Sequence, residues 1–339
     1  MAGSQVRETV DRPLKAGRIP GMKIVVLGAG VLGSIVAGHL ARAGEDVTLI
    51  ARSDRARYLM ENGITITGLA DFNSPCPIAT DPKELSEADV LILAVKTYDT
   101  EAAIASVAHV GFSSVISVQN GVQTNEKLAA VFGAASTVGS TAFFSGEMAP
   151  NGHVRFTGNE GFTVGELPDG VSDRVQDLAA VLQSSGINSQ AVANVLTLQW
   201  SKFVAWVALT SVAVFTRQET YKFLSDSGCA LICARVMREV AGIAGKRGIP
   251  LENSGPFPVK TAVSGSEDAA VAALIELGGF FEANAPGHRM SALQDLEHGR
   301  RLEIDETLGH AVAEAQRLNV TAPALELCYS LLKGINRYL

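Results

Sequence analysis

The chain has 339 residues, which is long enough for two domains, and its 47% hydrophobic and 19% charged residues are ordinary for a soluble α/β protein. A net charge of −7, with no run of Lys and Arg, argues against a nucleic-acid partner. The four cysteines lack the paired spacing of a metal site and the six histidines form no HxxxH pattern, so we expect no metal.

Residues 1–21 are polar and basic and have no apolar core of the kind that a secretion signal needs. We expect them to form a poorly ordered extension, either native or added. The longest apolar stretch, Phe203 to Phe215, is shorter than the roughly 20 residues of a membrane span, and it predicts a buried helix. These features favour a cytoplasmic protein without a membrane partner.

The most informative motif follows the first predicted strand, residues 23–27, and precedes a predicted helix over 34–43 and a second strand over 47–50. It is a GxGxxG sequence formed by Gly28, Ala29, Gly30, Val31, Leu32 and Gly33. Between a strand and a helix, this motif predicts a dinucleotide site in which the pyrophosphate lies at the helix N-terminus. The alternative is a glycine-rich turn without a ligand.

The end of the second strand indicates which dinucleotide binds. An NAD-selective site usually has Asp or Glu there, to bind the ribose 2′-OH. This chain has Ala51 followed by Arg52, and a guanidinium is suited to a 2′-phosphate. Arg55 and Arg57 could add positive potential. We therefore expect NADPH rather than NADH, unless Arg52 is only a solvated surface charge.

Strands and helices continue to alternate beyond this unit, which predicts a mostly parallel, doubly wound Rossmann sheet with helices on both faces. The further strands are expected at 64–67, 90–95, 114–118, 136–142 and, as an antiparallel edge strand, 162–165; a short helix is expected at 81–85 and a longer one at 172–185. From about Val192 only helical spacing remains, at 194–214, 228–247, 269–281, 301–318 and 322–336. The expected domains are residues 22–192, which bind the dinucleotide, and 193–339, which are all-helical, with the reaction site between them.

Polar side chains follow the predicted strands where the ligand crevice of an open α/β sheet lies. Lys96 could reach a phosphate or ribose, Asn120 could bind the nicotinamide or a substrate carbonyl, and Thr141 closes a further strand. The alternatives are a solvated loop lysine for Lys96 and a simple Asn-Gly turn for Asn120.

Lys202 lies among almost wholly apolar neighbours at the start of a predicted helix. Burial lowers the pKa of an amine toward neutrality, which suits a proton donor to a ketone oxygen; a lysine that extends to solvent is the alternative. Glu303 and Asp305 follow two arginines. Either carboxylate could bind a substrate hydroxyl or keep Lys202 charged, or could be an ordinary surface or capping acid.

Four segments, in this order and spacing, resemble the ketopantoate reductase (2-dehydropantoate 2-reductase) family. They are Lys23–Gly33 with GAGVLG, Ala94–Lys96, Gln119–Val122, and Ser291–Asp305 with SALQDLEHGRRLEID. The resemblance covers Met22 to Tyr338. It implies a Rossmann domain followed by a helical domain like that of 6-phosphogluconate dehydrogenases, and an NADPH-dependent reduction of a 2-keto acid in pantothenate biosynthesis.

The resemblance also implies roles for single residues. The catalytic lysine falls on Lys202, the substrate-binding serine on Ser291 and the glutamate on Glu303. The cofactor-site lysine and asparagine fall on Lys96 and Asn120, and the 2′-phosphate arginine on Arg52.

Two positions depart from the family pattern. Asparagines often stand four and eight residues after the lysine, where this chain has Trp206 and Thr210. An indole cannot accept a hydrogen bond, so the substrate is either ketopantoate or a different, bulkier or more apolar 2-keto acid or imine. A non-catalytic NADPH-binding sensor with Trp206 blocking the site is an alternative of another class. Whether the protein forms a homodimer stays open.

Overall fold

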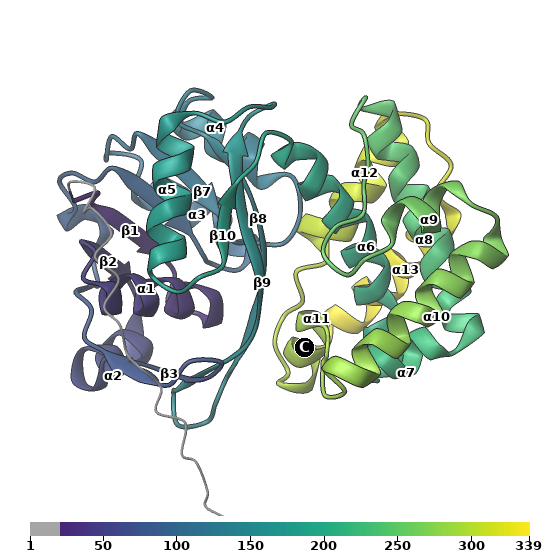
Figure 1. The fold of residues 1–339 in the computed structure, drawn as a ribbon, viewed down its shortest axis with the longest axis horizontal. Coiled ribbons are helices and arrows are strands. Elements are labelled where there is room, and N and C mark those ends of the chain that lie inside the picture. Colours follow the sequence, from purple (N-terminus) through teal and green to yellow (C-terminus); the bar gives the residue numbers. More distant parts are fainter. Residues whose placement is uncertain (1–20) are drawn as a thin grey trace, which may run out of the picture.

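The computed structural model describes residues 21–339, so the predicted extension lies outside the described residues except for Gly21. The described chain has an N-terminal half built on sheets and a C-terminal half of helices, joined by helix α6 (Figure 1). The strands are β1 (Ile24–Leu27), β2 (Val47–Ile50), β3 (Ile64–Gly68), β4 (Phe72–Ser74), β5 (Ile78–Ala79), β6 (Val90–Leu93), β7 (Ser114–Ser117), β8 (Val138–Met148), β9 (Val154–Glu166) and β10 (Ser189–Ala191).

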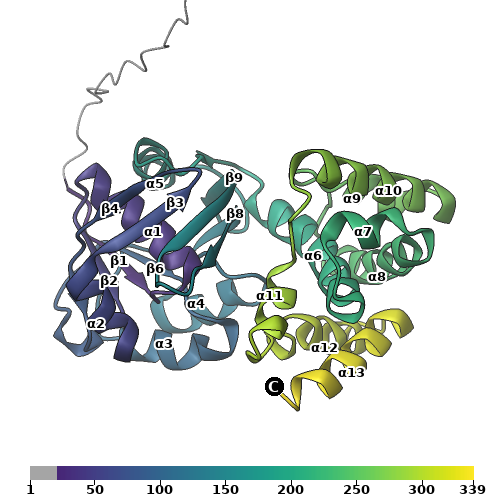
Figure 2. The ribbon, with the colours of Figure 1, turned by 90° about the horizontal axis from the view of Figure 1, so that it is seen from below.

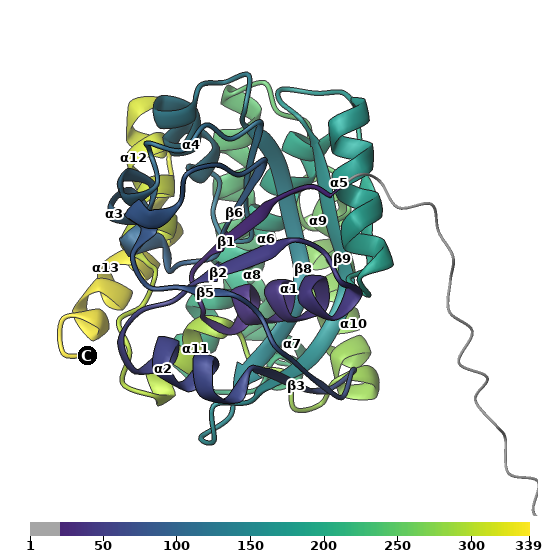
Figure 3. The ribbon, with the colours of Figure 1, turned by 90° about the vertical axis from the view of Figure 1, so that its left-hand side faces the viewer.

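The first sheet is five-stranded and wholly parallel, in the order β5-β2-β1-β6-β7. Its strands are nearly continuous apolar runs because helices cover both faces. Figure 3 shows α1 (Val31–Ala43) and α5 (Asp173–Ser184) on one side, and α3 (Thr100–Ser106) and α4 (Thr124–Phe132) on the other. The strand order reverses between β1 and β6, which is where such sheets bind ligands. The predicted Rossmann fold is confirmed.

The prediction of a single sheet was wrong. A second, mixed sheet has the order β10-β9-β3-β4, with β8 antiparallel to β9. The stretch 162–165 is therefore no edge strand, because β9 pairs with β8 on one side and with β3 and β10 on the other. Strand β8 also continues six residues beyond Ala142, so Thr141 lies in mid-strand rather than at its end.

Helix α1 lies between the two sheets and contacts strands of both. This position explains why its residues from Gly33 to Leu40 are all buried, although a helix that covers one face of a sheet normally keeps one polar side. His39 is enclosed there by the rings of Phe72 and Phe156. Burial lowers the pKa of His39, so the imidazole is a neutral part of the core.

The remaining helices form the C-terminal half. They are α6 (Val195–Thr216), α7 (Thr220–Ser225), α8 (Ser227–Lys246), α9 (Val259–Ser264), α10 (Glu267–Asn284), α11 (Ser291–Glu297), α12 (His310–Arg317) and α13 (Pro323–Asn336), with a π-helical turn at Asp305–Gly309. The all-helical character of the C-terminal half is confirmed.

Two further elements belong to the N-terminal half. Helix α2 (Ser53–Asn62) follows β2, and a short 3₁₀ turn, Pro82–Glu84, replaces the helix expected at 81–85.

Three short helices, α7, α9 and α11, were not predicted, because six or seven residues are too few to show a helical period. The helix predicted from Arg301 begins only at Asp305; residues 301–304 are irregular chain with a bend at Glu303. Helix α6 is the one helix among residues 21–339 that is long and apolar enough to cross a membrane. It is the core helix of this half, since 78% of its most apolar window is buried.

Candidate active site

The glycine motif forms the turn between β1 and α1, and its three glycines differ in their surroundings. A Cβ on Gly28, whose φ is +118°, would lie 2.8 Å from the backbone of Ala94, and one on Gly33 would lie 1.9 Å from the carbonyl oxygen of Gly28. Close packing therefore explains these two glycines. A Cβ on Gly30 would meet nothing within 4 Å.

The N-terminus of α1 has room and donors for an anion. Gly30 is the capping residue, no side chain caps the helix, and no acidic residue lies in its first turn. The first N–H groups of a helix have no partner within it, and the helix dipole favours negative charge there. The residues fit a dinucleotide pyrophosphate, which would lie over Gly30 on the N–H groups of Val31, Leu32 and Gly33.

The three neighbouring arginine side chains differ in whether they already have hydrogen-bond or ion-pair partners within the protein. Arg52 is exposed directly after β2, and its guanidinium has no hydrogen-bond partner among residues 21–339, while Ala51 beside it is buried. The guanidinium of Arg55 donates to the carbonyl oxygens of Ala29 and Gly152. Arg57 pairs with an acid of its own helix. Of the three arginines, Arg52 is the one available to a ligand.

Lys202, in the third turn of α6, reaches back to the first half of the molecule. Its Nζ donates to the carbonyl oxygen of Ala142 at 2.6 Å and to Oδ1 of Asn120 at 3.1 Å. The Nζ atom also lies 5.2 Å from the centre of the Phe143 ring. The third ammonium proton has no acceptor among the described residues, so it is free to bond a ligand.

Burial lowers the pKa of Lys202 to about 8, and no carboxylate opposes this shift. The amine is then still mostly protonated at neutral pH, by roughly ten to one at pH 7. An ammonium group that gives up its proton this readily is a better acid than an exposed lysine.

A narrow pocket borders this amine. It is lined by Gln119, Asn120, Gly121, Ser140, Thr141, Gln199, Lys202, Phe203 and Trp206. Its volume is about 10 Å³, which is room for about one water molecule, so a keto acid enters only if lining side chains or the two halves move. Trp206 is 7% exposed and forms part of the wall, whereas Thr210 is fully buried and does not reach the pocket.

A second polar cluster joins the two halves beside this pocket. Nζ of Lys96, which follows β6, lies 2.5 Å from Oδ2 of Asp295 and 3.1 Å from Oε2 of Glu303. The other oxygen of Glu303 accepts a hydrogen bond from the backbone N–H of Thr97 at 2.7 Å. Burial works against the charge of Lys96, but the two carboxylates outweigh it and raise the pKa of Lys96 above its usual value.

This cluster corrects the expectation that Glu303 could keep Lys202 charged. Glu303 is paired with Lys96 instead, because residues 301–304 are non-helical chain that places its carboxylate at the segment after β6. Asp305 accepts a hydrogen bond from the Tyr329 hydroxyl. Asp295 was missed, although it lies inside the Ser291–Asp305 segment; an Asp in a short helix gives no signal until its partner is known.

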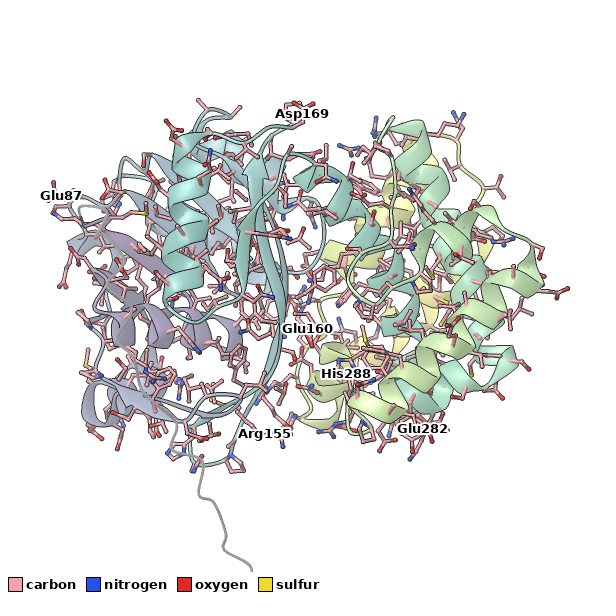
Figure 4. All side chains as sticks on the ribbon, in the orientation of Figure 1. Glu87, Arg155, Glu160, Asp169, Glu282 and His288 are labelled. Carbon is pink, nitrogen blue, oxygen red and sulfur yellow. The ribbon has the colours of Figure 1, made fainter. Side chains whose placement is uncertain are left out.

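The structure thus places Lys202 in direct contact with Asn120, and Lys96 in direct contact with Glu303. Ser291 is the first residue of α11, which packs on α6 between the two halves (Figure 2). It is half-buried and does not line the pocket at Lys202. Side chains from both halves fill the space between the two ribbons (Figure 4).

Comparisons with known proteins decide the family. The model described as "Ketopantoate reductase PanE/ApbA" matches residues 24–169, and that of its C-terminal part matches residues 194–336. The chain belongs to the ketopantoate reductase family. A relative named 2-dehydropantoate 2-reductase from Pyrococcus abyssi is 29% identical, over 92% of this chain and 97% of its own length.

Solved structures agree with this membership. A PanE/ApbA family ketopantoate reductase from Ralstonia eutropha has a TM-score of 0.78 at 25% identity, with 93% of this chain and 99% of that one covered. D-mandelate dehydrogenase, solved with NADH and anilino(oxo)acetate, has a TM-score of 0.80 at 18% identity, covering 93% of this chain and 99% of that one, and supports the fold alone. The chain is thus an oxidoreductase of the 2-dehydropantoate 2-reductase type that uses a nicotinamide cofactor.

Proposed function

We propose that this ketopantoate reductase family member reduces a 2-keto acid to the 2-hydroxy acid with NADPH, and that Lys202 delivers the proton. The observation that carries the proposal is the environment of its amine. Two protein acceptors hold it in a pocket at the carboxyl edge of the sheet, its pKa lies at about 8, and one proton is left for a ligand.

The bound nicotinamide supplies the hydride that the ketone carbon accepts. The ammonium group of Lys202 donates a proton to the ketone oxygen as negative charge develops there. Asn120 and the carbonyl oxygen of Ala142 fix the direction of the Lys202 amine. Glu303 and Ser291 are proposed to orient the substrate, and Asn120 to position the reacting face of the cofactor as well.

Residues 22–192 are proposed to act as the cofactor domain and 193–339 as the catalytic domain. Lys96 is then a cofactor-site residue that also links the two domains through Glu303. Its ammonium group could exchange a carboxylate for a ribose or phosphate oxygen of the cofactor, so contacts with ligands could replace the ion pairs that join the two halves.

Preference for NADPH is proposed from Arg52. The guanidinium is exposed and without a partner in the described part of the chain, and no carboxylate stands at the end of β2 to repel a 2′-phosphate. The test is kcat/KM for NADPH and for NADH. Equal values, or a preference for NADH, would reject this assignment.

Trp206 and Phe203 line one wall of the pocket, so we propose that the substrate has an apolar side chain. A panel of 2-keto acids at fixed NADPH, with ketopantoate, ketoisovalerate and the imine of a keto acid, tests the reaction and its specificity together. Binding of NADPH without turnover of any of them would favour a cofactor-binding sensor instead. Cytoplasmic location and a homodimer remain predictions.

A further inference from the structure

One buried polar atom in the pocket has no partner. Thr141 lies in β8 and is 3% exposed, and it lines the pocket next to Lys202. Its Oγ1 is buried and makes no hydrogen bond with any described residue. A buried hydroxyl without a partner costs stability, so we expect a molecule that enters the pocket, a water or a ligand, to form a hydrogen bond with it.

Three other neutral polar side chains of the pocket, Gln119, Ser140 and Gln199, are occupied. The amide of Gln119 donates to the carbonyl oxygen of Val95 and to Thr100. The hydroxyl of Ser140 donates to the carbonyl oxygen of Ser117, and the amide of Gln199 donates to the carbonyl oxygen of Ser140. Neither the two amide nitrogens nor the Ser140 hydroxyl is left free for a substrate.

The groups that remain can all donate a hydrogen bond, and the hydroxyl of Thr141 can accept one as well. They are the third proton of Lys202, the Nδ2 group of Asn120, whose Oδ1 is already used by Lys202, and the hydroxyl of Thr141. A ligand with acceptor atoms can bond all three groups at once, and an anionic one satisfies them best. A 2-keto acid has this pattern: a ketone oxygen beside a carboxylate.

We propose that the hydroxyl of Thr141 binds the carboxylate of the 2-keto acid and so holds the neighbouring ketone against Lys202. This inference rests on the proposed function and adds a substrate-binding residue to it. Thr141 lies next in sequence to Ala142, whose carbonyl oxygen holds the Lys202 amine, so one strand aligns both the acid and the substrate.

The variant Thr141→Val keeps the shape of the side chain and removes the hydroxyl, and Thr141→Ser restores it. We expect the valine variant to raise KM for ketoisovalerate about ten- to hundredfold, as loss of a bond to a charged group does. The Kd of NADPH should stay unchanged and the serine variant should stay close to wild type. Thr210→Val, which removes a hydroxyl that is also buried and unpartnered but lies outside the pocket lining, is the matched control.

Binding is also measured without turnover, by calorimetry of ketoisovalerate added to the complex with oxidised cofactor. We expect the same weakening there, and a smaller effect of Thr141→Val on kcat/KM for the methyl ester, whose ester group is neutral. Because Oγ1 of Thr141 has no partner, the valine variant should unfold at an equal or higher temperature than wild type; if it does not fold, Thr141→Ala takes its place.

Unchanged KM and Kd for the keto acid in the valine variant would overturn the inference. A weaker affinity for NADPH would move Thr141 to the cofactor, and an equal penalty for acid and ester would exclude the carboxylate. Failure of the wild type to reduce any 2-keto acid rejects the proposed function instead, and calorimetry still tests the Thr141 contact in that case.

Discussion

Replacing Lys202 by Met removes the amine and keeps most of the volume of the side chain. The ketone oxygen then develops charge without a proton donor beside it. General acid catalysis typically contributes 10²–10⁴-fold, so we expect kcat for keto acid reduction to fall by about that factor, or roughly 3–5 kcal/mol of activation free energy.

Stability should change much less than activity. Lowering the pKa of Lys202 from 10.5 to about 8 corresponds to at most about 3 kcal/mol of destabilisation by the buried charge, and partial contact with solvent reduces this value. Removing the amine relieves that cost. It also leaves Oδ1 of Asn120 and the carbonyl oxygen of Ala142 without a donor, at about 1–3 kcal/mol for each. The two effects have opposite sign and similar size, so the variant should fold.

The assay follows NADPH absorbance at saturating cofactor and keto acid, with unfolding measured on the same preparations. Lys222→Met, which removes an exposed lysine paired with Glu219, is the matched control and should keep wild-type kcat. Cofactor binding by Lys202→Met should be retained. A folded variant with near-normal kcat would show that the proton comes from another group, and the mechanism proposed for Lys202 would be refuted.

Five further predictions follow from the structure. Because reduction needs the protonated amine, kcat/KM should fall about tenfold per pH unit above pH 8 in the wild type, and a flat profile to pH 10 would contradict the assignment of Lys202. Folding lowers the pKa of Lys202, so the buried charge destabilises the folded state fully below pH 8 and progressively less toward pH 10.5. In urea unfolding, the wild type should therefore gain stability relative to Lys202→Met as the pH rises from 8 to 10.5. Arg52→Gln should lower kcat/KM for NADPH by about ten- to hundredfold and leave NADH unchanged; an equal loss for both would mean that Arg52 does not bind the 2′-phosphate. Glu303→Gln removes the negative charge that faces Lys96 and should lower kcat/KM. Thr210→Val removes an unpartnered buried hydroxyl and should raise the free energy of unfolding by about 1 kcal/mol. A lower stability of the Thr210→Val variant in a thermal or urea melt would disprove the second prediction.

Local patterns were enough to predict the parts of the fold that depend on neighbours in sequence. The turn from Gly28 to Gly33 joins a buried strand to a helix, and that order of residues predicts a Rossmann unit wherever it occurs. The long apolar run of α6 predicts a helix because a continuously apolar, buried strand usually has only about 4–8 residues, and its missing polar face predicts burial.

Pairing between distant segments could not be predicted in this way. The sequence at 162–165 looks like an edge strand, yet β9 is paired on both sides, because strand partners depend on where the chain returns and not on the residues of the strand. The position of α1 between two sheets likewise depends on distant segments of the chain, because the strands of the second sheet that it contacts follow later in the sequence.

The candidate site divides along the same line. Residue types and the neighbouring apolar sequence indicated Lys202, Asn120, Lys96 and Glu303 one at a time, since a lysine among apolar residues or an Asn-Gly after a strand is visible locally. Their pairing, Lys202 with Asn120 and Lys96 with Glu303, depends on how α6 and the segment after α11 pack against the ends of β6 and β7. The unpartnered hydroxyl of Thr141 likewise exists only in three dimensions, because a hydrogen bond is satisfied or left open by atoms that are distant in the chain.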